Sequence, residues 1–176
     1  MGSMRTKAIL YLCLTCGAVE AQNSLTSTAI QRYFTGVRRN LEAAADAMPA
    51  EKYGFRLTDG QMTFAEWLNH STERNYTDCA TLKAEPVPDV GKGPITLSSK
   101  VPVTQALKDS LAYCAKALES VNDQQVIATP QMSYAFLHVI VHNNEIYGNL
   151  AGYLRVNGIV PPSTAARLKQ QNEKKN

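Results

Sequence analysis

The spacing of apolar residues along the chain predicts several long helices. In residues 25–48, apolar side chains recur every three or four positions, with polar and charged side chains between them. The same period runs through residues 102–121, with Thr104 as the expected cap, and through a segment from about 132 to 156. Because no alternating run is long enough to make a β-sheet, the pattern favours an all-α protein.

A further helix is predicted from a start signal at Thr63. Thr63 followed by Glu66 matches a capping box, in which each side chain bonds the other residue's backbone N–H. The helix that follows, over residues 64–82, is polar in its middle. Polar residues occupy three positions where an apolar stripe would otherwise continue: His70, Glu73 and Asn75.

Proline and glycine residues separate the predicted helices. Residues 83–100 contain three prolines and two glycines, which predicts an extended crossover between the second and third helices. Asn157-Gly158 predicts the end of the last long helix, and a short C-terminal helix is expected after the "VPPST" turn. We therefore expect a four-helix bundle with one long crossover over residues 22–168, followed by a polar, disordered tail at residues 169–176.

The first residues match a secretory signal peptide. The basic stretch "MRTK" precedes an apolar run, "AILYLCLTCGAV", that is too short to span a bilayer comfortably. Val19 and Ala21 fit the small positions of a cleavage site, so residues 1–21 are predicted to be removed, with Gln22 starting the mature chain. Residues 1–3 resemble a remnant of an expression tag. The pattern predicts a periplasmic or secreted protein without stable membrane insertion; the alternative is an apolar N-terminal helix of a cytoplasmic protein.

Composition fits one globular domain and indicates no nucleic-acid partner. The chain has 176 residues, of which 44% are hydrophobic and 19% charged, and its net charge is +3. So small a charge does not indicate binding to nucleic acid. Without the signal peptide, only Cys79 and Cys114 remain as cysteines. In an oxidising compartment they could form a disulfide, and otherwise they would be two small buried residues.

The last long helix carries a candidate metal-binding pattern. His138 and His142 lie four residues apart, so both imidazoles can point into the same space, with Glu145 further along that face. His70, on the polar second helix, is the candidate third ligand. Three protein ligands and an open position are typical of a catalytic metal site. A histidine pair at this spacing is also common as an ordinary packed or surface pair.

The segment "FLHVIVHNNEIYGNLAGYLRVNGIVPPST" resembles the C-terminal helix of the DinB superfamily. "MTFAEWLNHSTERNY" resembles that family's second helix, including a histidine at the position of His70, and the first helix with its following Met-Pro is also similar. The resemblance covers nearly all of residues 22–168. It implies an antiparallel four-helix bundle of up-down-down-up type, with a divalent metal, often nickel or zinc, held by three histidines.

One of the family's ligand positions is altered in this chain. Carried over residue by residue, His70 and His142 match two ligand positions, whereas the third falls at Ile146, which cannot bind a metal. Three outcomes are open. His138 could replace the missing ligand, or Glu145 could contribute a carboxylate oxygen. Alternatively, the metal is lost and His70 and His142 remain as a hydrogen-bonded polar pair.

Two hypotheses of different classes follow from these patterns. The first is an exported DinB-like protein with a divalent metal, nickel or zinc, at His70, His142 and His138. An occupied site would suit a hydrolase or transferase, with Glu145 or Glu73 as the proton-transfer group. The second is a metal-free bundle, ligand-binding or stress-related, without catalysis. The partners considered are a small-molecule ligand and a second copy of the chain.

Overall fold

The computed structural model describes residues 25–175, and every regular element within them is a helix. The predicted all-α class is therefore confirmed. The expected signal peptide, residues 1–21, lies outside the described residues. Four helices are long: α2 (Leu25–Ala47), α3 (Phe64–Leu82), α4 (Lys100–Glu119) and α6 (Pro130–Val156). Four elements are short: η1 (Ala50–Lys52), η2 (Asp89–Gly91), α5 (Asp123–Val126) and α7 (Pro162–Glu173).

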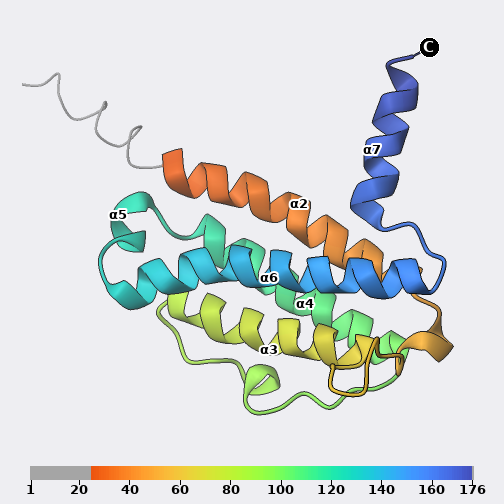
Figure 1. Cartoon of the computed structure of the whole chain (residues 1–176). Coiled ribbons are helices and arrows are strands. Elements are labelled where there is room, and N and C mark those ends of the chain that lie inside the picture. The colour runs from red at the N-terminus through yellow and green to blue at the C-terminus, as the bar shows by residue number, and fades with distance from the viewer. Residues whose placement is uncertain (1–24, 176) are drawn as a thin grey trace, which may run out of the picture.

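The four long helices lie side by side around one hydrophobic core (Figure 1). Both α2 and α3 pack against α4 and α6. Each long helix places a leucine with no exposed surface in this core: Leu41, Leu68, Leu107 and Leu150. Because full burial of one such side chain is worth about 1.5–3 kcal/mol, the shared core determines which faces of α3 and α6 meet.

Local signals place the ends of the two helices that carry the histidines. The predicted capping box is present at the start of α3. Thr63 N–H donates to Glu66 Oε2 at 2.6 Å, and Glu66 N–H donates to Thr63 Oγ1 at 3.2 Å. α6 ends before Gly158, whose φ of 74° glycine adopts without strain. The Ile159 N–H then bonds to Leu154 O at 2.9 Å, as in a Schellman motif.

The start of α4 differs from the expectation. The pattern placed it near Pro102 with Thr104 as the cap, but α4 begins at Lys100 after the N-cap Ser99. Pro102 lies in the first turn, where its missing N–H removes no intrahelical bond. Thr104 is buried, and its hydroxyl pairs with Tyr53 Oη at 2.7 Å. The hydroxyl therefore joins the core instead of capping the helix.

The C-terminal segment is more helical than expected. The polar tail predicted to be disordered from residue 169 is instead part of α7 as far as Glu173. Lys169 Nζ lies 3.9 Å from Glu173 Oε1 at i, i+4 spacing, and the residues between them are tolerated in helices. α7 projects away from the other helices (Figure 1), and none of its residues is buried. It therefore adds little to the core.

A disulfide joins α3 to α4. Cys79 and Cys114 are bonded to each other, and neither side chain has exposed surface. Of the two alternatives open from the sequence, the structure has the disulfide. The bond connects positions 35 residues apart and so closes the long crossover between α3 and α4 into a loop.

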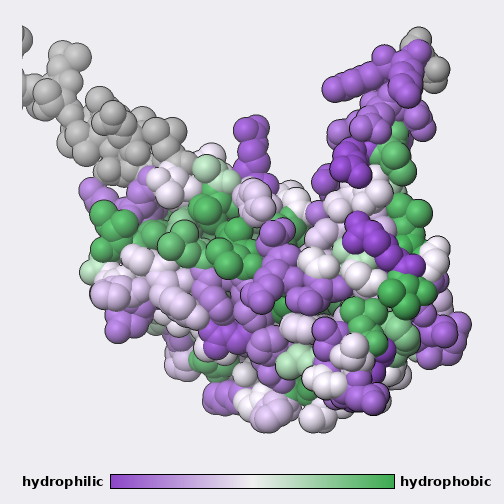
Figure 2. Space-filling view, in the orientation of Figure 1, coloured by the Kyte–Doolittle hydropathy of each residue, from purple (hydrophilic) through white to green (hydrophobic). Residues whose placement is uncertain are grey.

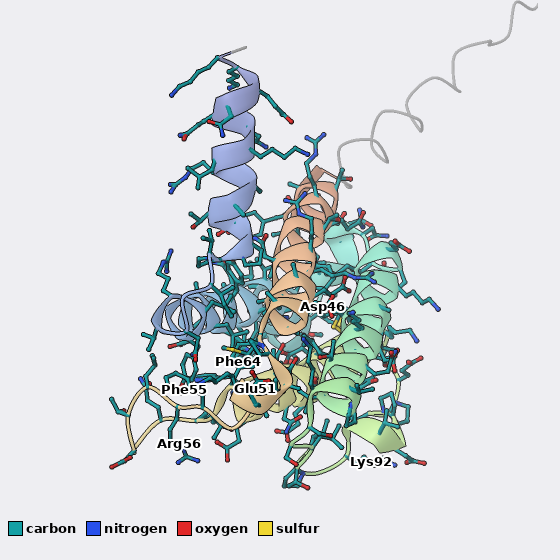
Figure 3. All side chains as sticks on the ribbon, turned by 90° about the vertical axis from the view of Figure 1, so that its right-hand side faces the viewer. Asp46, Glu51, Phe55, Arg56, Phe64 and Lys92 are labelled. Atoms are coloured by element: carbon teal, nitrogen blue, oxygen red, sulfur yellow. A yellow bond between two sulfur atoms is a disulfide. The ribbon has the colours of Figure 1, made fainter. Side chains whose placement is uncertain are left out.

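The loop between η1 and α3 is tied to the adjoining helices. Phe64 N–H donates to Phe55 O at 2.9 Å, and the Phe55 ring packs edge-on against Tyr153 of α6 at a centroid distance of 5.9 Å. Figure 3 shows Phe55 and Phe64 near each other, with Arg56 farther out on the loop. These contacts hold the loop beside the start of α3.

The surface of the packed helices is mixed in polarity. Within residues 25–175, no helix combines the length and the apolar character needed to cross a bilayer. Figure 2 shows apolar side chains gathered over the N-terminal halves of α2 and α6. On α6, Leu137 and Val141 are 55% and 61% exposed. Because they are four residues apart, they form one apolar stripe on the outside of the helix.

Candidate metal site between α3 and α6

The packing of α3 against α6 brings the three histidines of the chain together. His70 lies on α3, and His138 and His142 lie one turn apart on α6. The centroid of the His142 ring is 4.8 Å from that of His70 and 4.8 Å from that of His138. These three residues form a histidine cluster with His142 at its centre.

His70 and His142 meet through their Nε2 atoms, which are 3.1 Å apart. Without a metal, two nitrogens at this distance form a hydrogen bond, in which one neutral ring donates and the other accepts. Two nitrogens bound to one tetrahedral zinc ion, at about 2.0–2.1 Å each, would lie about 3.3–3.4 Å apart. The pair would need to separate only slightly to share a metal ion.

His138 is oriented by a carboxylate. Its Nδ1 lies 2.7 Å from Asp78 Oδ2, and because a carboxylate only accepts, the His138 Nδ1–H is the donor. Arg74 binds the other oxygen of the same carboxylate at 2.7 Å, and Tyr134 stacks on the His138 ring at 4.8 Å. Histidines that bind metals are commonly held in this way by a carboxylate on their second nitrogen. When Nδ1–H donates to Asp78, the lone pair of the uncharged imidazole form of His138 lies on Nε2.

The surroundings of His142 keep its ring neutral. Burial lowers the pKa of His142 to about 4, with further lowering from His70, His138 and Arg74. A neutral imidazole is the form that binds a metal ion. The His142 Nδ1 is buried and has no hydrogen-bond partner among the described residues. In most metal sites that atom would donate to a carboxylate or a carbonyl.

A buried polar network lies next to the histidine cluster. Asn143 of α6 accepts a hydrogen bond from Ser71 Oγ at 2.7 Å and donates to Asn75 Oδ1 at 2.6 Å, both on α3. Asn75 in turn donates to Ser110 Oγ of α4 at 3.0 Å. All four residues are buried. The polar middle of α3 therefore serves partly to join three helices.

The two glutamates considered for proton transfer lie in different environments. Glu145 is exposed on α6, whereas Glu73 is partly buried on α3, less than one turn from His70. The Glu73 carboxylate accepts the backbone N–H of Ile95. Ile146, at the altered ligand position, is 1% exposed and packs in the core. A shielded carboxylate is therefore available from Glu73 and not from Glu145.

As the side chains lie, a third ligand position is not formed. Across residues 25–175, no three His, Cys, Asp or Glu side chains are arranged to hold a metal ion. The sequence pattern pointed to the histidines but not to Arg74 and Asp78, which position His138. A signal was available, because Arg74 and Asp78 follow His70 at successive four-residue steps on one face of α3.

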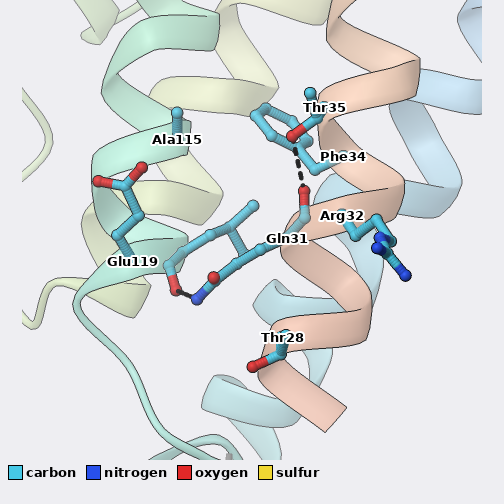
Figure 4. Close-up of a pocket in the computed structure, with 8 residues that line it drawn as sticks. Thr28, Gln31, Arg32, Phe34, Thr35, Ala115 and Glu119 are labelled. Carbon is cyan, nitrogen blue, oxygen red and sulfur yellow. Dashed lines mark hydrogen bonds between the residues drawn. The ribbon is translucent and has the colours of Figure 1, made fainter. Parts of the chain in front are cut away.

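A separate hollow lies between α2 and α4 (Figure 4). Its volume is about 300 Å³, and Gln31 reaches across it to donate to Leu118 O at 2.7 Å. Arg32 and Glu119 stand on different helices at its edges. The side-chain amide of Gln31 is already hydrogen-bonded, and no histidine lines this hollow. The hollow is therefore a weaker candidate for a functional site than the histidine cluster.

Comparisons with known proteins identify no relative of this chain. No protein-family model, no curated protein and no solved structure matches it.

Proposed function

We propose that this protein is an exported, DinB-like bundle that binds one divalent metal ion, nickel or zinc, through His70, His142 and His138. The proposal includes an antiparallel up-down-down-up arrangement of α2, α3, α4 and α6. The long crossover between α3 and α4 and the DinB-like sequence of α6 support this arrangement.

The observation that carries the proposal is the 3.1 Å separation of two Nε2 atoms on facing helices. With the pKa of His142 lowered to about 4, its ring is neutral at physiological pH and releases no bound proton when a metal approaches. His70 and His142 therefore fit as two ligands of one metal ion.

His138 is the proposed third ligand and takes the place of the family position at Ile146. Its hydrogen bond to Asp78 leaves Nε2 as the nitrogen with a lone pair. Binding requires this Nε2 to turn toward the other two histidines. The unpaired Nδ1 of His142 weakens the site, because lost outer hydrogen bonds typically cost about 10–100-fold in metal affinity.

A bound metal ion would supply a Lewis acid or a hydroxide, which suits a hydrolase or a transferase. Glu73 is the better candidate for the proton-transfer group. It is partly buried and lies near His70 on α3, whereas Glu145 is exposed. The Ile95 N–H that the Glu73 carboxylate accepts would hold that carboxylate in place.

A second candidate function is that of a metal-free bundle, in which the His70–His142 hydrogen bond only joins α3 to α6. The orphaned Nδ1 of His142 favours it. If His142 donates from Nε2, Nδ1 holds only a lone pair. Metal on Nε2 would instead place a buried N–H at Nδ1 without an acceptor, which is unfavourable.

Calorimetric titration separates the two candidates. Untagged protein, stripped with chelator, is titrated with zinc and then with nickel. We expect one binding event that His142→Ala abolishes and that His138→Ala weakens by at least about tenfold. Glu145→Gln, an exposed change on the same helix, is the matched control and should bind like wild type. No binding heat from folded wild-type protein would favour the metal-free bundle.

Export and self-association complete the proposal. The signal pattern in residues 1–21 supports export, and a disulfide between Cys79 and Cys114 persists best in an oxidising compartment. Mass spectrometry of the exported protein should give a chain that begins at Gln22. A homodimer would cover Leu137 and Val141, and sedimentation analysis would detect it.

A further inference from the structure

A groove of about 390 Å³ opens beside His70. One wall is a stripe of α3 with residues three or four positions apart: Glu66, Asn69, His70 and Glu73. The other wall is the loop that carries Arg56 and Met62, which Figure 3 shows through its labelled Arg56, together with Ile95 of the crossover. Among the three histidines of the chain, only His70 lines this groove.

The charge of the groove favours a cation. Asp59, Glu66 and Glu73 line it, and Arg56 is the only lysine or arginine among the described residues that do so. Arg56 Nη2 lies 3.9 Å from Glu66 Oε2, and both side chains are about half exposed, so this ion pair is weak. Two carboxylates remain in excess over the single arginine.

Asn69, which also lines the groove, has an unused acceptor. The residue is 3% exposed, and its Nδ2 donates to Leu97 O at 2.7 Å. Its Oδ1 is buried and accepts no hydrogen bond from any described residue. A buried acceptor without a donor is unfavourable, and a ligand N–H that reached it would remove that cost. This observation is independent of the carboxylates and favours the same kind of ligand, one that donates hydrogen bonds.

We propose that this groove binds a small primary amine in its ammonium form. An ammonium group has three donors and no acceptor, which matches the Asn69 amide oxygen and the Glu73 and Glu66 carboxylates. Met62 and Ile95 provide apolar surface for the carbon chain. The volume of about 390 Å³ is at the small end of the range for ligand sites, which fits a compact amine. This proposal goes beyond the metal site and stands without it.

Nuclear magnetic resonance of ¹⁵N-labelled, metal-free protein tests this proposal. n-Butylammonium is titrated at low ionic strength, where screening is weak, with n-butyrate as the matched anion. We expect saturable shifts at the side-chain amide of Asn69 and at the backbone amides of Gly60 and Ile95, with butylammonium only. Glu73→Gln keeps an acceptor for the Ile95 N–H and should weaken binding by about threefold to tenfold.

Glu119→Gln is the matched charge control, because Glu119 lies on α4 and does not line this groove. Equal shifts with butylammonium and butyrate would overturn the proposal, and so would unchanged affinity in the Glu73→Gln protein. Because the titration uses metal-free protein, its failure leaves the metal proposal standing. Failure of metal binding equally leaves the amine site standing.

Discussion

Reduction of the Cys79–Cys114 disulfide should destabilise the protein by a predictable amount. The bond closes a loop of 35 residues between two helices that share one core. In the chain-entropy treatment, opening a loop of this length costs about 4 kcal/mol at 25 °C, through the greater freedom of the reduced, unfolded chain. This is a large part of the about 5–15 kcal/mol by which single domains are stable.

Urea unfolding of wild-type protein with and without reductant measures this cost. We expect the midpoint to fall in reductant, with a loss of about 2–4 kcal/mol in the free energy of unfolding. The double variant Cys79→Ala/Cys114→Ala is the control. Its stability should be low and unaffected by reductant. Identical wild-type curves under the two conditions, or two free thiols in the mass of the exported protein, would refute the reasoning.

Two further predictions concern the stability of contacts with α3, made by His142 of α6 and by Gly91 of η2. Since His142 has its pKa lowered from 6.5 to about 4, the unfolded chain binds a proton between these values that the folded chain does not, so stability falls as the pH drops through this window. Allowing for partial exposure of the ring, wild type should lose about 1–2 kcal/mol more than His142→Asn in chelator-treated urea titrations, and equal losses would contradict this. A Cβ at Gly91 would collide with the Tyr76 side chain, so Gly91→Ala should lower the free energy of unfolding by about 1–3 kcal/mol in thermal unfolding. Gly60→Ala is the control and should be neutral, because a Cβ at Gly60 has open space around it. Equal effects of the two substitutions would show that the collision relaxes freely.

Local signals in the sequence account for much of the fold. The capping box at Thr63 and the Asn157-Gly158 stop predict where α3 begins and α6 ends, because both act through backbone bonds within a few residues. The prediction that Thr104 caps α4 was wrong for a related reason. The hydroxyl of Thr104 finds its partner, Tyr53, 51 residues away, and no local pattern reports that contact.

In the candidate metal site, too, local spacing could be predicted from the sequence, whereas contacts between helices could not. The i, i+4 spacing of His138 and His142 predicts that they share a face of one helix, and the polar middle of the second predicted helix adds His70. The contact of His138 with Asp78 depends on how far α3 is shifted along α6. That shift is set by packing of the whole core, which the sequence does not express at any single position. Helical spacing therefore predicts candidates, whereas their outer partners require the structure.

The most direct measurement of the central claim is the metal content of untagged protein after incubation with zinc and nickel and removal of free ions. We predict about one equivalent of metal per chain in wild type and less than about a tenth in His142→Ala. Less than about a tenth of an equivalent in folded wild-type protein would contradict the claim and leave His70 and His142 as a hydrogen-bonded pair between two helices.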